Sequence, residues 1–367
     1  MIASFQHPAC VAGLVAVLAA TGAFAGTPAP AAIWSRDNLH AWSVAPFDAV
    51  NRSPEERAQM LQRLGIRKYA YSWRERHIPE FDAEIQAMKK YGIELLAWNF
   101  LSVEIDDPLA RAALEAFRRN GVRPQIWVMQ SARDRPRTMA DWAKYVSPGV
   151  KLPDSQEVLQ KMAEPERSRI QGELKKARRR VQLESFTLTP EGQRQRVIRE
   201  ADRIKRIVAA AAPYGCKVAL YSHNSWFGVM DNQVAIIERL RELGVTEVGI
   251  VYNFHHARDE DHDDTRDFAA IWKKIHPYVT ALTVSGLRFE GQLIYPSQGD
   301  SELAMMRVIQ SSGWRGSVGI SAEKGGDAAQ TLRNYQLGID WLAAELARPG
   351  SGGPRPFPAL PPFEPTH

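Results

Sequence analysis

The sequence predicts a (β/α)8 TIM barrel, an α/β fold of eight parallel strands closed into a ring, with a helical insertion between strands 4 and 5. Two observations predict this fold class. Short apolar runs that end in polar residues recur along the chain, and a segment with helical periodicity follows each; the clearest lie at 217–223, 248–256, 279–285 and 316–323. Chemistry gathered at the carboxyl ends of buried parallel strands is typical of enzymes with this architecture.

Eight strand and helix pairs can be read in order. The candidate strands are 38–45, 66–73, 93–100, 123–130, 217–223, 248–254, 279–285 and 316–323. The helices are expected to begin near Ser53, Pro79, Asp107, Asp141, Asp231, Asp263, Ser301 and Asp327, several of which are good N-cap residues. Glycines follow the expected helix ends in the pattern of C-caps, at Gly65, Gly92, Gly121, Gly215, Gly244 and Gly313. Eight such alternations imply a closed parallel barrel.

Length and composition favour one barrel with an insertion over two domains. The chain has 367 residues, of which 44% are hydrophobic and 24% charged, and this is the composition of an ordinary globular protein. The insertion spans about 131–216 and holds two expected helices, near 155–182 and 191–212. Residues 165–206 contain 13 Lys and Arg against 6 Asp and Glu. We favour a solvated helical hairpin there over an anion-binding lid above the barrel mouth.

The two ends of the chain have their own signatures. Residues 1–25 are expected to form a signal peptide, because an apolar core at 11–20 precedes the cleavage-type sequence Ala23-Phe24-Ala25. The expected location is therefore periplasmic or secreted, with no membrane association after cleavage. The barrel domain is expected to span 26–348. The Pro- and Gly-rich tail at 349–367 is expected to be disordered.

Strand periodicity selects the side chains that enter the barrel mouth. On each of strands five to eight, polar residues near the carboxyl end share one parity, ending at His223, Asn253, Ser285 and Glu323. The chain after strand six turns through His255 and His256. A histidine at a strand end is a candidate general base, so His223, His256 and Glu323 are candidate catalytic residues.

Strand two and the tryptophans suggest a site for a sugar or another carbonyl compound. Arg74 and His77 follow strand two and complete the candidate catalytic set. Aromatic rings stack on the apolar faces of sugars. The candidate substrate-binding residues are Trp42, Trp73, Trp98, Trp226, Asn253 and Lys324. The alternatives are an ion pair of Arg74 with a nearby carboxylate and tryptophans that pack in the core.

Several segments resemble one family. VALYSHNSWFG (218–228), VGIVYNFHH (248–256), LRNYQLGIDWL (332–342) and YSWRERH (71–77) look like secreted members of the sugar phosphate isomerase/epimerase group. The resemblance covers about residues 36–346 apart from the insertion. It implies the xylose-isomerase-like TIM barrel and, in the metal-dependent epimerases, Glu, Asp, His and Glu ligands at the ends of strands five to eight.

This chain departs from that ligand pattern. Tyr221, Asn253 and Thr283 stand at the first three ligand positions, and Ser321 or Glu323 stands at the fourth, depending on register. Neutral oxygens are poor replacements for carboxylates and imidazole at a divalent metal. A conventional centre is therefore not expected. If a divalent metal (Mn, Mg or Zn) is bound, the residues expected to hold it are His223, His256 and Glu323.

These observations predict a secreted carbohydrate-active enzyme, an isomerase, an epimerase or a carbon–oxygen lyase that abstracts a proton next to a sugar carbonyl. A 3-keto-glycoside would suit an exported enzyme. The alternative is a catalytically inactive glycan-binding barrel. The expected partner is a small-molecule carbohydrate. The net charge of +5 is mild, and with export and the missing metal cluster it argues against nucleic acid.

Overall fold

The eight predicted strands close into one parallel barrel. The structure, a computed structural model, describes residues 33–101, 104–130, 136, 138–184, 188–223, 226–258, 263–288, 293–358 and 360. The strands are β1 (Leu39–Trp42), β2 (Lys68–Tyr71), β3 (Glu94–Leu101), β4 (Gln125–Val128), β5 (Val218–Tyr221), β6 (Val248–Asn253), β7 (Val279–Thr283) and β8 (Ser317–Ser321). Neighbours in sequence pair in parallel, and β1 pairs with β8 to close the ring, as predicted. The expected signal peptide lies outside the described residues.

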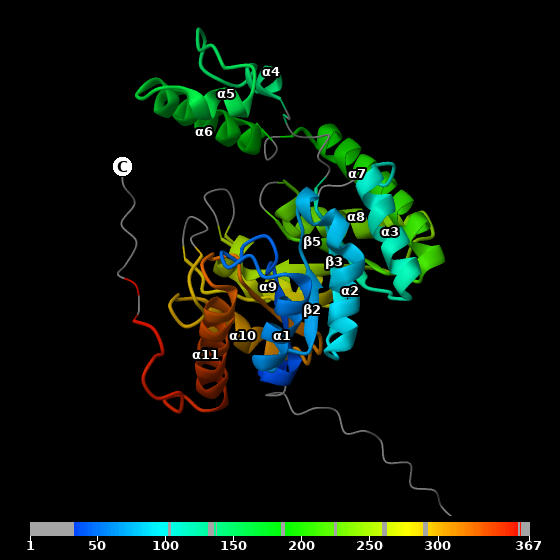
Figure 1. Cartoon of the computed structure of the whole chain (residues 1–367), viewed down its shortest axis with the longest axis vertical. Helices are drawn as coiled ribbons and strands as arrows, with labels where there is room; N and C mark the ends of the chain where they lie inside the picture. Colours follow the sequence, from blue (N-terminus) through cyan, green and yellow to red (C-terminus); the bar gives the residue numbers. More distant parts are fainter. Residues whose placement is uncertain are drawn as a thin grey trace, which may run out of the picture.

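Helices surround the barrel and form the inserted segment (Figure 1). They are α1 (Pro54–Arg63), α2 (Phe81–Lys90), α3 (Pro108–Asn120), α4 (Met139–Trp142), α5 (Gln156–Lys161), α6 (Glu166–Glu184), α7 (Pro190–Ala211), α8 (Met230–Glu242), α9 (Phe268–Ile275), α10 (Glu302–Ser311) and α11 (Ala328–Ala347). The six predicted C-cap glycines all have positive φ, as Gly121 does at 59° after α3. Within the described residues, none of the helices has the length and apolar character needed to span a membrane.

Local capping explains where helix starts differ from the sequence prediction. Ser53 and Asp107 cap α1 and α3 as expected, through hydrogen bonds to backbone N–H groups. The helix expected near Asp141 begins earlier, because Thr138 is its N-cap and Asp141 closes the capping box. The helix expected near Asp263 is preceded by a short 3-10 turn, and α9 begins after Asp267.

The two faces of the strands pack in two different layers. Inside the barrel, Trp42, Trp127 and Tyr221 pack together, and the last two rings stack with centroids 5.7 Å apart. Below them His40 lies fully buried, and a Cβ on Gly319 would come within 2.5 Å of the His40 Nε2 atom. Outside the barrel, the other strand face packs against the helices. The interior is therefore filled with side chains.

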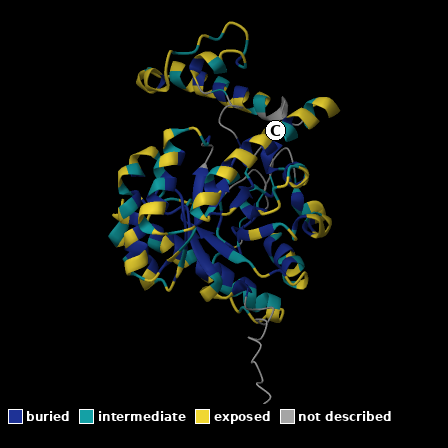
Figure 2. Ribbon diagram, turned by 90° about the vertical axis from the view of Figure 1, so that its right-hand side faces the viewer, coloured by how far each residue is buried: buried dark blue, intermediate teal, exposed yellow. Residues whose placement is uncertain are grey.

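The insertion divides into a small lobe and a long return helix. The lobe consists of α4, α5 and α6, and it has its own apolar cluster that includes Leu159, Ile170 and Leu174. Because the chain leaves β4 at its carboxyl end, the lobe stands on the side of the barrel mouth (Figure 1). Its outer surface is largely exposed (Figure 2). Helix α7 then returns along the barrel and packs against α8.

The described part of the tail, residues 349–358 and 360, lies against the barrel. Phe357 stacks on Tyr295 with ring centroids 4.8 Å apart, and the Arg355 guanidinium lies 5.0 Å from the centroid of the Trp341 ring. The Trp341 indole N–H donates to the Gly353 carbonyl. These aromatic partners lie on α11 and on the segment before α10, so composition alone could not reveal them. Figure 1 shows the tail beside α11.

Candidate active site

A cavity lies at the mouth of the barrel, where the carboxyl ends of the strands meet. Its volume is about 90 Å³. The residues that line it come from seven of the eight strands or from the loops after them: Trp42, Ser43, Phe47, Ser72, Arg74, Asn99, Met129, Tyr221, His223, His256 and Glu323. The structure therefore brings together His223, His256, Arg74, Glu323 and Trp42, which the sequence analysis selected.

Two histidine rings lie against each other in the lining of this cavity. The rings of His223, just after β5, and His256, in the 3-10 turn after β6, have centroids 4.2 Å apart and planes tilted by 41°. The chain can turn tightly beyond His223 because Gly228 has no side chain: a Cβ there would lie 1.5 Å from the His223 carbonyl oxygen. The Asn253 side chain accepts a hydrogen bond from the His255 N–H and caps the turn that carries His256.

Arg74 and Glu323 supply opposite charges to the same cavity. Burial raises the pKa of Glu323 to about 7, and the nearby Arg74 guanidinium opposes this by favouring the carboxylate. Burial lowers the pKa of Arg74, and Glu323 opposes that shift. The Ser321 hydroxyl accepts a hydrogen bond from the Glu323 N–H at 2.9 Å, which fixes the backbone where the carboxylate leaves β8. Glu323 can therefore change protonation state near neutral pH.

The residues at the positions of the family's metal ligands do not fit a metal centre. The Asn253 amide donates to the Tyr221 phenol oxygen at 2.6 Å, and Thr283 lies beside the same phenol. Burial raises the pKa of Tyr221 well above its usual range, so its oxygen stays protonated and neutral. No three His, Cys, Asp or Glu side chains among the described residues cluster closely enough to hold a metal. These neutral donors suit a hydrogen-bonded barrel floor.

Three predicted site residues from strands 2 and 3 lie away from the cavity. Trp73 and Trp98 point to the outer face, where both rings pack on Phe81. On β2 and β3 the inward parity belongs to Ser72 and Asn99, so the neighbouring tryptophans must point outward. His77 is buried, its Nδ1 accepts a hydrogen bond from the Arg74 N–H at 2.9 Å, and burial lowers its pKa to about 4. His77 therefore contacts the backbone of Arg74 and does not line the cavity.

The other predicted substrate-binding residues support the walls of the site instead of lining the cavity. Trp226 is buried under α7, and its indole N–H donates to Gln193 at 2.6 Å. Asn253 lies below the cavity on the Tyr221 phenol. The Lys324 ammonium lies 5.0 Å from the centroid of the Tyr295 ring and donates to the Leu293 carbonyl.

The cavity also contains residues that the sequence analysis did not select. Ser72, Asn99 and Met129 line its β2 to β4 side. Strand parity indicates these three, because each lies two positions after an inward residue, Ala70, Ala97 or Trp127, and so points to the same side of its strand. Ser43 and Phe47 could not be found this way, since the chain leaves strand geometry directly after Trp42.

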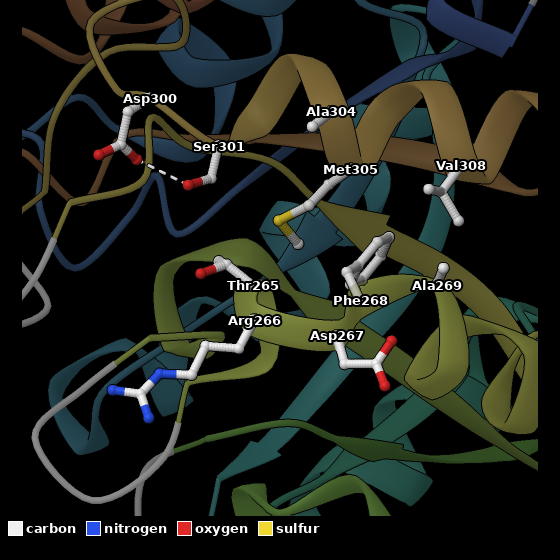
Figure 3. Close-up of a pocket in the computed structure, with 10 residues that line it drawn as sticks. All are labelled: Thr265, Arg266, Asp267, Phe268, Ala269, Asp300, Ser301, Ala304, Met305 and Val308. Atoms are coloured by element: carbon white, nitrogen blue, oxygen red, sulfur yellow. Dashed lines mark hydrogen bonds between the residues drawn. The ribbon is translucent and has the colours of Figure 1, made fainter.

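A larger groove lies outside the barrel, between the starts of α9 and α10. Its volume is about 310 Å³. Figure 3 shows Phe268 and Met305 among the side chains that line it, with Asp300 hydrogen-bonded to the Ser301 hydroxyl. The groove contains none of the predicted site residues. The smaller mouth cavity is therefore the better candidate site despite its size.

The comparisons with known proteins show the fold. No protein-family model and no curated protein matches this chain. The structure of IolI protein with a binding zinc atom superimposes with a TM-score of 0.52 at 12% identity, over 84% of this chain and 98% of that one. A xylose isomerase-like TIM barrel protein from Mycobacterium smegmatis in complex with magnesium has a TM-score of 0.48 at 12% identity, over 83% of this chain and 95% of that one. D-allulose 3-epimerase from Methylomonas sp. has a TM-score of 0.45 at 11% identity, over 82% of this chain and 96% of that one. In fold, the chain is a TIM barrel of eight parallel strands, as predicted, and it shares this fold with IolI protein.

Proposed function

We propose that this protein is a carbohydrate-processing enzyme that abstracts a proton from the carbon next to a sugar carbonyl. The observation that carries the proposal is the convergence of two histidines, an arginine and a glutamate with a raised pKa on one cavity at the barrel mouth. Titratable groups with shifted pKa values that share a cavity are the usual mark of acid–base catalysis.

In this mechanism an imidazole is the base. His223 or His256 removes the proton from the carbon, and the electrons of that bond move to the carbonyl oxygen to give an enediolate. The Arg74 guanidinium stabilises the negative oxygen, because a permanent cation in a half-buried site is already oriented toward the developing charge. General base catalysis of this kind contributes about 10²- to 10⁴-fold in rate.

Glu323 completes the reaction in its protonated form. A carboxylic acid with a pKa of about 7 can donate a proton near neutral pH. Return of that proton to carbon gives isomerisation or epimerisation. Its delivery to a glycosidic oxygen, as the bond between carbon and that oxygen breaks, gives elimination. Because the residues at the family's ligand positions are neutral, no step of this mechanism passes through a metal.

We also propose that the substrate is a 3-keto-glycoside or a free ketose and that the protein acts in the periplasm or outside the cell. The support for export is the apolar segment before Ala23-Phe24-Ala25. The competing proposal is an inactive glycan-binding barrel, which the neutral residues at Tyr221, Asn253 and Thr283 favour.

The test is incubation of the purified protein with ketoses and with 3-keto-glucosides, followed by chromatography of the products. We expect conversion by the wild-type protein and a loss of about 10²-fold or more in Arg74→Met, which keeps the bulk of the side chain without its charge. Arg76→Met, a change at an exposed arginine two residues away, is the matched control. Binding of these sugars without any conversion would support the glycan-binding barrel instead.

A further inference from the structure

Ser43 occupies an unusual place at the cavity. It follows β1 directly and has a φ of 53°, in the left-handed region that residues other than glycine rarely adopt. The residue is 1% exposed and lines the cavity together with Arg74 and Glu323. Its hydroxyl makes no hydrogen bond within the described part of the chain. A buried hydroxyl without a partner is costly, so its position needs an explanation.

The surrounding backbone holds Ser43 in this conformation from both sides. The carbonyl of Trp42 accepts a hydrogen bond from the Ala322 N–H, and the carbonyl of Val44 accepts two, from the N–H groups of Phe47 and Asp48. The buried Asp48 carboxylate then binds the Arg52 guanidinium and the N–H of Ala328 at the start of α11. Strained residues that persist under such constraint are concentrated at functional sites.

We propose that the Ser43 hydroxyl is a recognition group for a hydroxyl of the bound ligand. The ligand class is accordingly a polyhydroxylated carbonyl compound, as opposed to a simple ketone or aldehyde. The inference rests on the proposed function, because it assumes that the carbonyl lies between Arg74 and the two histidines. A site with a buried hydroxyl aimed at a ligand hydroxyl discriminates against analogues that lack it, since the protein group then stays unpaired.

The decisive variant is Ser43→Gly. Glycine adopts positive φ without strain, so this variant is expected to fold and to melt at or above the wild-type temperature. The matched control is Ser297→Gly. Ser297 also has a positive φ, 80°, and a buried hydroxyl without a hydrogen bond in the described residues, but it does not line the cavity. The pair therefore separates relief of strain from loss of a ligand contact.

The experiment measures binding of D-fructose, D-allulose, a 3-keto-glucoside and hydroxyl-free cyclohexanone by ligand-observed NMR, together with thermal melting. We expect Ser43→Gly to bind the best sugar roughly three- to tenfold more weakly, the effect of one hydrogen bond, while Ser297→Gly binds it as the wild type does. Cyclohexanone should bind all three proteins equally weakly.

Three results would overturn the assignment. Equal sugar binding by the wild type and Ser43→Gly would remove Ser43 from recognition and leave the proposed function intact. A Ser43→Gly variant clearly less stable than the wild type would show that the hydroxyl has a structural role. If the wild type neither binds nor converts any sugar of the panel, the proposed function fails and the Ser43 assignment fails with it.

Discussion

At the residue scale, Glu323 has the most consequential environment in the molecule. It is half-buried, its pKa is raised to about 7 by burial, and the opposing attraction of Arg74 is the smaller of the two effects. A carboxyl group in this setting exchanges its proton near neutral pH, where an unperturbed glutamate is almost fully ionised. The same property that suits it to proton transfer makes its ionisation unfavourable for folding.

This gives a prediction for stability against pH. Because the native state holds the Glu323 proton more tightly than the unfolded state does, the free energy of unfolding should fall as the pH rises from about 4.5 to about 7 through this group. Glu323→Gln removes that dependence. Its free energy of unfolding, relative to that of the wild type, should therefore rise by roughly 1–3 kcal/mol from pH 5 to pH 8. Urea unfolding at both pH values measures it.

The control is Glu75→Gln, at an exposed glutamate. If the free energy of unfolding relative to the wild type changes equally in Glu323→Gln and Glu75→Gln between the two pH values, the raised pKa of Glu323 is wrong.

Residue types and strand parity predicted much of the candidate site. His223, His256, Arg74 and Glu323 line one cavity because parallel strands end together and side chains alternate. Aromatic content alone does not place Trp73 and Trp98 correctly, because strand parity turns both rings outward onto Phe81. Ser43 could not be predicted, since the backbone around it is held by hydrogen bonds from residues far away in the sequence, Ala322 after β8 and Ala328 at the start of α11.

At the element scale, helix α7 braces the loop that carries His223. The side-chain oxygen of Gln193 accepts a hydrogen bond from the Trp226 indole N–H, and the side-chain amide of Gln193 donates to the Asn232 side chain. The Asn232 amide in turn donates to the backbone carbonyl of Trp226, and each of these distances is 2.6 Å. The Arg196 guanidinium lies over the Trp226 ring at 4.6 Å. This return helix of the insertion is therefore tied to the wall of the candidate site through two hydrogen bonds of Gln193.

Gln193→Met should loosen this loop. The substitution keeps the side-chain volume but removes both hydrogen bonds, with an expected cost of about 1–3 kcal/mol. Hydrogen exchange should become faster in peptides covering 226–233, and the NMR signal of the His223 ring should shift. Gln195→Met, on the exposed side of the same helix, is the control. Unchanged exchange at 226–233 in Gln193→Met would contradict the brace.

The tail gives a second element-scale prediction. Phe357 stacks on Tyr295, whose ring also contacts the Lys324 ammonium next to Glu323. Phe357→Ala should cost about 0.5–1.5 kcal/mol, the value of an aromatic pair, and should increase hydrogen exchange at 293–299. Leu337→Ala, at an exposed apolar residue of α11, is the control. Exchange at 293–299 that matches the wild type would mean that the tail does not support this segment.

At the scale of the whole molecule, the fold was predictable and the placement of its additions was not. Eight strand and helix alternations with glycine C-caps specify a closed barrel, and the structure has one. The lobe of α4 to α6 and the docked tail depend on contacts between distant segments. Periodicity predicts the helices of the lobe but not that they form a separate apolar cluster.

The neutral barrel floor predicts how the protein responds to removal of metal. Tyr221, Asn253 and Thr283 lack the charge needed to hold a divalent ion tightly. Dialysis against EDTA should therefore leave the melting temperature and any sugar conversion unchanged, and elemental analysis should find no stoichiometric metal afterwards. Mn²⁺ or Zn²⁺ that stays bound through this dialysis at one equivalent per chain would show that the barrel mouth does hold a divalent ion tightly.

The central claim is that the barrel mouth moves a proton next to a sugar carbonyl. The most direct measurement is NMR of a ketose or 3-keto-glucoside incubated with the protein in D₂O. The account predicts deuterium at the carbon next to the carbonyl with the wild type, and a rate lower by about 10²-fold or more in the His223→Ala, His256→Ala double variant. Exchange that continues unchanged in the double variant, or a wild-type protein that binds the sugar and exchanges no proton, would contradict it.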